Sequence, residues 1–128
     1  QKTTDPIIIG TNIINLFQTI VSRNKDPLKS AVLSVTSFQA GNAFNIIPSN
    51  AYIKGTVRTF DPFLDDEIYK RMHSIISSVT GAMGAEYSFD YRKSYPPVVN
   101  SKEIVDIIVK ASSKVNFLSP ISKSLHQN

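Results

Sequence analysis

The polar side chains best suited to chemistry in this sequence lie in a loop predicted from Gln39 to Asn50 and on the strand that follows it. Asn45, inside that loop, can donate a hydrogen bond to a carboxylate or accept one from an amide N–H. Arg58, on the strand expected to follow, can hold a carboxylate through two parallel hydrogen bonds. Each also has a structural alternative: Asn45 as a turn residue bonded to its own backbone, and Arg58 as a solvated cation. The pattern therefore indicates ligand binding without bond-breaking chemistry.

Residues that could hold a metal ion or act as a nucleophile are scarce. The sequence has no cysteine, and its two histidines, His73 and His126, are expected on a helix flank and near the end of the chain. We expect His73 to be a surface residue. The acidic residues between positions 61 and 67 are explained by helix capping and by the helix dipole. With no Ser-His-Asp set or carboxylate pair, we predict no catalytic residue and no metal site in this chain.

Length and composition are those of one globular domain, since 128 residues with 41% hydrophobic and 19% charged side chains can bury a core. The net charge of +4 is the only argument for a nucleic-acid binder, and the Lys and Arg residues are scattered. No apolar run approaches the ~20 residues of a membrane span, and the start of the chain lacks the apolar core of a secretion signal. We expect a cytoplasmic protein without a nucleic-acid or membrane partner.

A first helix is predicted from Asp5-Pro6 to about Arg23, because Asp can cap a helix and Pro fits its first position. Apolar residues at three- to four-residue steps give it one buried stripe. Further apolar residues lie outside that stripe: Ile7, Ile8, Ile14 and Val21. A helix that is apolar on more than one face packs against two partners. These are either a sheet on one side and another subunit on the other, or two parts of its own domain.

Alternating residues predict strands over 31–38, 51–60 and 85–95, and a second Asp-Pro pair predicts a helix over 61–82. The aromatic side chains of the third strand are expected in the core, with a stacking platform for bases as the alternative. Asn100 with Glu103 resembles a capping box and predicts a third helix whose apolar face is formed by Ile104, Val105, Ile108 and Val109.

The predicted order is helix, strand, strand, helix, strand, helix. It matches a ferredoxin-type split β-α-β repeat whose first strand is missing. The predicted fold class is α+β, a ferredoxin-like open-faced sandwich with an antiparallel sheet and helices on one face. The missing central strand leaves three alternatives: two existing strands close the gap, the tail of the chain fills it, or a partner chain lends a strand.

Four motifs occur in order with natural spacing: Leu-Phe-Gln-Thr-Ile-Val-Ser-Arg-Asn, Gly-Asn-Ala-Phe-Asn-Ile-Ile-Pro, Gly-Thr-Val-Arg-Thr-Phe-Asp and Tyr-Pro-Pro-Val-Val-Asn. Together they closely resemble the lid, or dimerisation, domain of the amidohydrolase branch of the aminoacylase and carboxypeptidase-G metallopeptidases. Hippurate hydrolases, N-acetyl-diaminopimelate deacetylases and auxin-conjugate hydrolases belong to that branch. The resemblance extends from residue 1 to about residue 100.

The resemblance implies a homodimer that forms through the first helix and the edge strand Ala31–Phe38. It also implies that Asn45 contacts the carboxylate or scissile carbonyl of a substrate and that Arg58 matches the strand arginine of the family. Gln39 stands where many relatives carry a histidine that stabilises an oxyanion, and a glutamine amide could still donate a hydrogen bond there. The implied substrate-binding residues are Asn45, Arg58 and Gln39.

The resemblance further implies a parent enzyme whose catalytic domain holds two divalent metal ions, zinc or manganese, and hydrolyses N-acyl amino acids or related amides. Residues 1–97 would form the lid and residues 98–128 the start of the return into the catalytic domain. Lacking the metal ligands, this chain alone is expected to need no cofactor and to be inactive. The alternative is a stand-alone homodimerising module that binds a small carboxylate.

Overall fold

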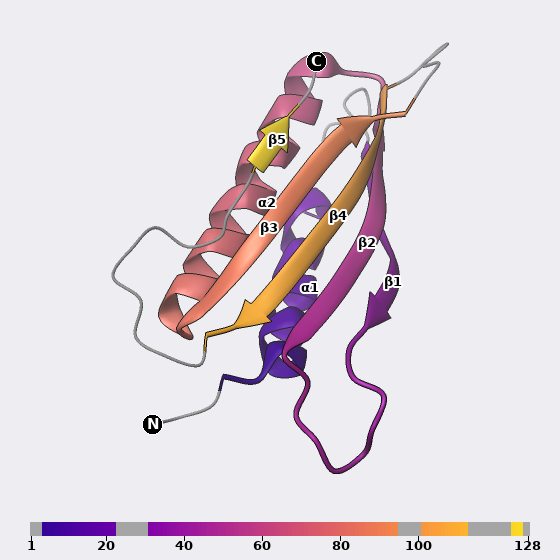
Figure 1. The fold of residues 1–128 in the computed structure, drawn as a ribbon. Helices are drawn as coiled ribbons and strands as arrows, with labels where there is room; N and C mark the ends of the chain where they lie inside the picture. The colour runs from indigo at the N-terminus through magenta and orange to yellow at the C-terminus, as the bar shows by residue number, and fades with distance from the viewer. Residues whose placement is uncertain (1–3, 23–30, 95–100, 113–123, 127–128) are drawn as a thin grey trace.

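The computed structural model describes residues 4–22, 31–94, 101–112 and 124–126. This part of the chain contains two helices and five strands, with two strands after the first helix and three after the second (Figure 1). They are α1 (Pro6–Ser22), β1 (Ala31–Gln39), β2 (Asn50–Thr59), α2 (Pro62–Ala82), β3 (Ala85–Lys93), β4 (Ser101–Ala111) and β5 (Ser124–His126).

The strands form one sheet in the order β1-β2-β4-β3-β5. The first four are antiparallel to their neighbours, and the short β5 runs parallel to β3 at the opposite edge from β1. Both helices lie against one face of this sheet. The predicted α+β class, a ferredoxin-like open-faced sandwich, is therefore confirmed.

The two Asp-Pro pairs begin the two helices as the sequence predicts. Asp5 accepts a hydrogen bond from the amide of Ile7 at 3.0 Å. Asp61 accepts one from the amide of Phe63 at 2.9 Å. Each carboxylate thereby satisfies an amide that has no partner within the first turn of the helix. After α2, Gly84 has a φ of +71°, a left-handed conformation in which glycine avoids the strain of a side chain.

The predicted third helix is wrong, because residues 101–111 form strand β4 in the centre of the sheet. Its side chains alternate, and the inward ones are buried: Glu103, Val105, Ile107 and Val109. The segment is rich in β-branched residues, which lose side-chain freedom in a helix and pack well on a pleated sheet. The capping-box pattern at Asn100 and Glu103 did not decide its structure.

Of the three alternatives for the missing central strand, the structure shows the second: the tail of the chain supplies it as β4, between β2 and β3. It pairs with β2 on one side and with β3 on the other, antiparallel to both. The domain boundary at residue 97 stays a prediction, although β4 and β5 both extend the same sheet beyond it.

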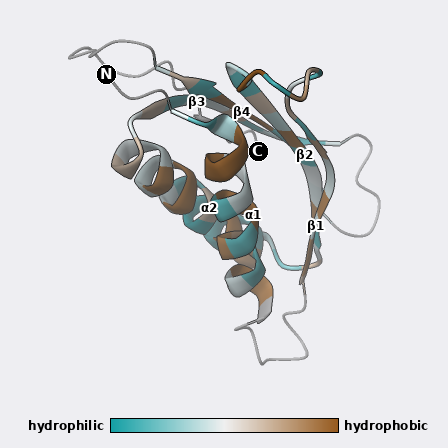
Figure 2. Cartoon of the chain, turned by 90° about the horizontal axis from the view of Figure 1, so that it is seen from below, coloured by the Kyte–Doolittle hydropathy of each residue, from teal (hydrophilic) through white to brown (hydrophobic). Residues whose placement is uncertain are grey.

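The core lies between the two helices and the covered face of the sheet. Hydrophobic residues colour both helices and the strands that face them (Figure 2). Phe17 and Met72 are the large buried side chains near the middle of α1 and α2. Tyr87, Phe89 and Tyr91 are buried on β3, so the expectation that this aromatic stripe belongs to the core is confirmed. Within the described residues, neither helix combines the length and hydropathy needed to cross a membrane.

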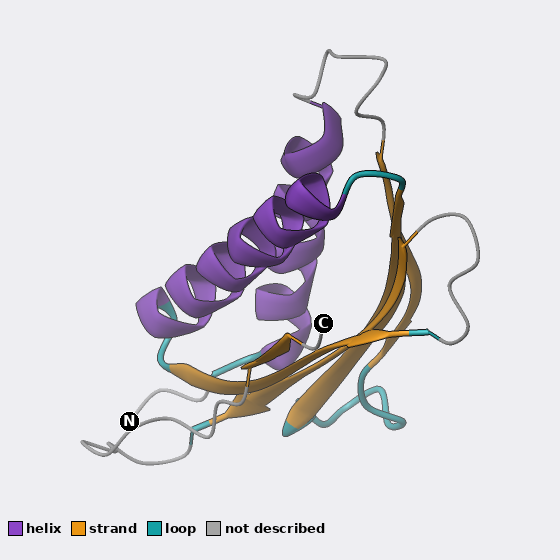
Figure 3. Ribbon diagram, turned by 90° about the horizontal axis from the view of Figure 1, so that it is seen from above, coloured by secondary structure: helices purple, strands orange, loops and turns teal. Residues whose placement is uncertain are grey.

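Within the part of the chain that the structure describes, the opposite face of the sheet carries no helix (Figure 3). Its centre is occupied by ion pairs within β3 and between neighbouring strands. Arg92 contacts Asp106 at 2.7 Å and Asp90 at 2.8 Å, and Lys54 lies 3.9 Å from Asp106. These pairs are partly exposed and contribute little stability each, and the Oδ1 atom of Asp90 has no hydrogen-bonding partner among the described residues.

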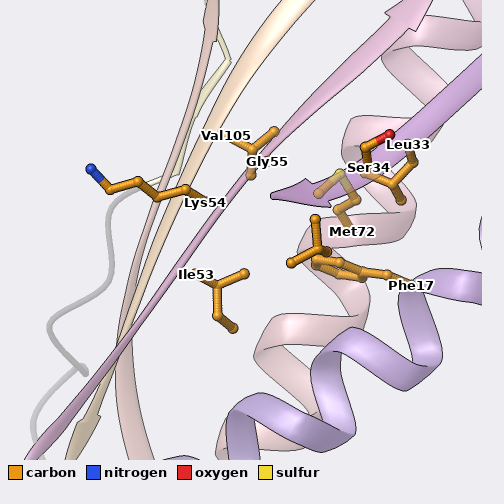
Figure 4. A pocket seen from close by; sticks show the side chains of 9 residues that line it. Phe17, Leu33, Ser34, Ile53, Lys54, Gly55, Met72 and Val105 are labelled. Atoms are coloured by element: carbon orange, nitrogen blue, oxygen red, sulfur yellow. The ribbon is translucent and has the colours of Figure 1, made fainter. Parts of the chain in front are cut away.

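A β-bulge in β1 brings the backbones of β1 and β2 unusually close. The register of the two strands shifts between Val35 and Ser37, opposite Gly55. A Cβ atom added to Gly55 would collide with the backbone carbonyl oxygen of Ser34. Figure 4 shows Gly55 beside Val105, its register partner on β4. The backbone contact explains why a glycine is needed here.

Gly55→Ala should lower the free energy of unfolding by about 1–3 kcal/mol, because the backbone must move to admit the methyl group. Urea denaturation of the chain measures this change. Gly81→Ala in α2 is the matched control, since an added Cβ there has nothing within 4 Å. It should be neutral or stabilising by up to about 1 kcal/mol, as alanine favours helix. Equal stability of wild type and Gly55→Ala would contradict the close contact.

Candidate functional site

The loop between β1 and β2, residues 40–49, projects from one end of the sheet. Gly41 has a φ of +75°. Phe44 and Asn45 form the centre of a turn in which the amide of Ile46 donates to the carbonyl of Ala43 at 3.5 Å. All residues from 41 to 47 are exposed. The loop thus presents the side chains of residues 41–47 to the surroundings, while Ala40 at its start packs against the core.

Asn45 is exposed at the tip of this turn. Its side chain forms no hydrogen bond with the described part of the chain, so its carboxamide retains both a donor and an acceptor for a ligand. Its neighbours Phe44, Ile46 and Ile47 are large apolar side chains that are also exposed. An amide group flanked by apolar side chains suits a ligand with both a polar and an apolar part.

Gln39 is the last residue of β1 and pairs in register with Tyr52 near the start of β2. It is exposed and lies at the end of the sheet from which the loop projects. The structure therefore places Gln39 and Asn45 at the same end of the domain.

Arg58 lies at the other end of β2, exposed on the helix-free face. Tyr52 and Arg58 are six positions apart in β2, which corresponds to about 20 Å of strand. Arg58 is in register with Val32 of β1 and Lys102 of β4. It forms no ion pair with any described residue. A small ligand at Asn45 would therefore be out of reach of Arg58 of the same chain.

His73 differs from the expectation of a surface residue, because it lies partly buried among aromatic rings. Its Nε2 is 2.9 Å from the hydroxyl of Tyr87, and its ring stacks with Tyr69 and Phe89. The hydrogen bond and the stacking explain the position as structural. In the described residues, no group of three or more His, Asp or Glu side chains could hold a metal ion.

A second surface feature runs along α1 beside the edge strand β1. Phe38 lies over Gly10 of α1, with its ring atom Cε1 2.7 Å from the place that a Cβ atom would take. Ile7 and Ile14 are three positions before and four positions after Gly10, which puts them on the same side of the helix. Phe38, Ile7 and Val32 are exposed, and Ile14 is partly buried. No described strand pairs with the outer edge of β1.

Comparison with known proteins decides the family. Residues 1–84 match the sequence model of the peptidase dimerisation domain. The chain belongs to this family. The match includes α1, β1, β2, α2 and the loop of residues 40–49, and it confirms the resemblance drawn from the motifs.

Several characterised relatives are enzymes. The chain is 45% identical over 103 residues to N-acyl-L-amino acid amidohydrolase of Geobacillus stearothermophilus, covering 80% of this chain and 28% of that protein. It is 34% identical over 110 residues to N-acetyl-L-cysteine deacetylase of Bacillus subtilis, covering 86% and 26%. It is 33% identical over 117 residues to thermostable carboxypeptidase 1 of Saccharolobus solfataricus, covering 91% and 30%. The chain thus spans less than a third of the length of these relatives.

Asn45→Ala and Gln39→Ala should each change the free energy of unfolding by less than about 0.5 kcal/mol, because both side chains are exposed. Asp61→Ala is the matched control, since it removes the cap of α2 and should cost about 1 kcal/mol. Thermal and urea denaturation of the three variants provide the measurement. A loss above 1 kcal/mol for Asn45→Ala would assign that residue a structural role in the loop.

Proposed function

We propose that this chain is the lid and dimerisation domain of a longer metal-dependent amidohydrolase that hydrolyses N-acyl amino acids or related amides. The observation that carries the proposal is the 45% identity to an N-acyl-L-amino acid amidohydrolase. The exposed loop around Asn45 supports it, because a lid needs side chains that project beyond its own core. The cytoplasmic location expected from the sequence stays a prediction.

In the parent enzyme, Asn45 would orient the substrate by a hydrogen bond to its carboxylate or scissile carbonyl. Gln39, at the same end of the sheet, could donate to the oxygen that gains negative charge during hydrolysis. Arg58 would hold a carboxylate only at a separate position, given its place near the opposite end of β2. The apolar neighbours of Asn45 suit an acyl group.

Two divalent metal ions, zinc or manganese, would belong to the catalytic domain of the parent. The described residues of this chain offer no donor set for them, so no step through a metal is assigned to these residues. On its own, the chain is proposed to position substrate without hydrolysing it.

Replacement of Asn45 in the parent enzyme tests the substrate contact. Asn45→Ala should lower kcat/KM for an N-acyl amino acid by about 10- to 100-fold, since a lost substrate hydrogen bond costs about 1–3 kcal/mol. Steady-state kinetics provide the measurement. Asn42→Ala, an exposed asparagine in the same loop, should leave kcat/KM within about twofold. An unchanged kcat/KM for Asn45→Ala would remove Asn45 from the site.

We further propose that α1 and the outer edge of β1 pair with a second copy of the chain. The edge offers unpaired backbone groups, and the apolar side chains beside it are poorly covered. Antiparallel pairing of two β1 strands across a two-fold axis would give the backbone groups hydrogen-bonding partners and would cover the apolar side chains. The family description as a dimerisation domain supports this assignment.

A charge within the proposed interface should convert the dimer into a monomer. Val32→Lys and Ile14→Asp each bury a charge on pairing, and light scattering should report the mass of a single chain for both. Ile8→Asp is the matched control: Ile8 is 52% exposed and two positions from Gly10, on the side of α1 turned away from β1. It should remain dimeric. A dimer that survives both interface changes would exclude this surface.

A further inference from the structure

The central strand β4 carries a carboxyl group into the core. Glu103 is 0% exposed, and no group of the described residues donates a hydrogen bond to either of its carboxyl oxygens. An ionised carboxylate is costly in such a place, because it has lost its water without gaining hydrogen bonds in return. The buried side chain is therefore more easily accommodated with its proton.

The charged and titratable groups around Glu103 come from two elements. From α2, Asp65 is 5% exposed and accepts a 2.6 Å hydrogen bond from the hydroxyl of Tyr91 on β3. From β3, Lys93 is in register with Glu103. The register partner on β2 is the apolar Val57, and α1 contains no titratable residue. Burial raises the pKa of Glu103 most. A hydrogen bond from its protonated carboxyl group to Asp65, and then the charge of Asp65, raise this pKa further, to about 8, against a smaller opposing effect of Lys93.

The same residue has a favourable place in an alternative structure of this segment. In a helix that begins after Asn100, Glu103 would be the third residue, where a negative charge is stabilised by the amides of the first turn. Ile104, Val105, Ile108 and Val109 would then share one face. The family model matches residues 1–84, and β4 follows that match in the chain. An ionised Glu103 thus disfavours the strand and favours its alternative.

We propose that β4 is a releasable strand, whose hold on the centre of the sheet weakens as Glu103 loses its proton. Release brings Glu103 into water and leaves the facing edges of β2 and β3 unpaired, where another strand can pair. The strand is held most firmly below the ordinary pKa of a glutamate, where Glu103 is protonated in both states. Its hold is lost progressively as the pH rises towards 8.

Amide hydrogen exchange of the intact chain between pH 5 and 8.5 tests the proposal, after correction for the intrinsic exchange rate. The opening constant at Val105 and Ile107 should rise about tenfold per pH unit up to pH 8, because the open state binds one proton fewer. In Glu103→Gln, which has the same shape and no proton to lose, it should change less than about twofold over the whole range.

Two further variants keep the test decisive. Asp106→Asn, on the open face of the same strand, should weaken protection at every pH and keep the wild-type slope. Asp65→Asn retains Glu103 but removes its charged neighbour, so the rise of the opening constant should end at a lower pH. This variant replaces Glu103→Gln in the test if Glu103→Gln does not fold. A flat wild-type profile, or equal slopes in wild type and Glu103→Gln, would overturn the proposal. So would an equal slope at Ile13 of α1, because the whole domain would then unfold together.

Discussion

The pairing of β4 between β2 and β3 is the constraint on which the rest of the fold depends. Its hydrogen bonds to both neighbours make one continuous sheet from two parts of the chain. Its side chains Val105, Ile107 and Val109 form part of the surface on which the helices pack. Without it, β2 and β3 would present unpaired backbone edges in the middle of the domain. The strand that completes the core also brings the carboxyl group of Glu103 into it. The central strand therefore carries a buried side chain to which no described group donates a hydrogen bond.

The two edges of the sheet, and the end from which the loop of residues 40–49 projects, differ in how far they are covered by other parts of the chain. β5 pairs with the outer edge of β3, whereas no described strand covers β1, which lies beside exposed apolar residues of α1. Residues 41–47 of the loop are all exposed, while Ala40 at its start packs against the core. Stability resides between the helices and the sheet, while the uncovered edge and the loop are available for partners. This separation suits a domain that positions other parts of a larger protein.

The geometry also limits how the expected binding residues can cooperate. Gln39 and Asn45 share one end of the sheet, whereas Arg58 lies about 20 Å along β2. Spacing in sequence gave no sign of this separation, because the distance follows from the direction of β2 away from the loop. A small ligand that needs both an amide and a guanidinium cannot draw them from Asn45 and Arg58 of one copy of this chain.

The sequence by itself determined the two helices, three of the strands and the family. Asp5-Pro6 and Asp61-Pro62 are local signals that act within one turn, and alternation in β2 and β3 reflects burial on one side of a sheet. The tertiary structure decided the state of residues 101–111, since their apolar pattern satisfies a helix and a strand alike. The free position between β2 and β3 selected the strand. A local pattern could not reveal this, because the hydrogen bonds that hold β4 come from residues up to sixty positions away in the chain.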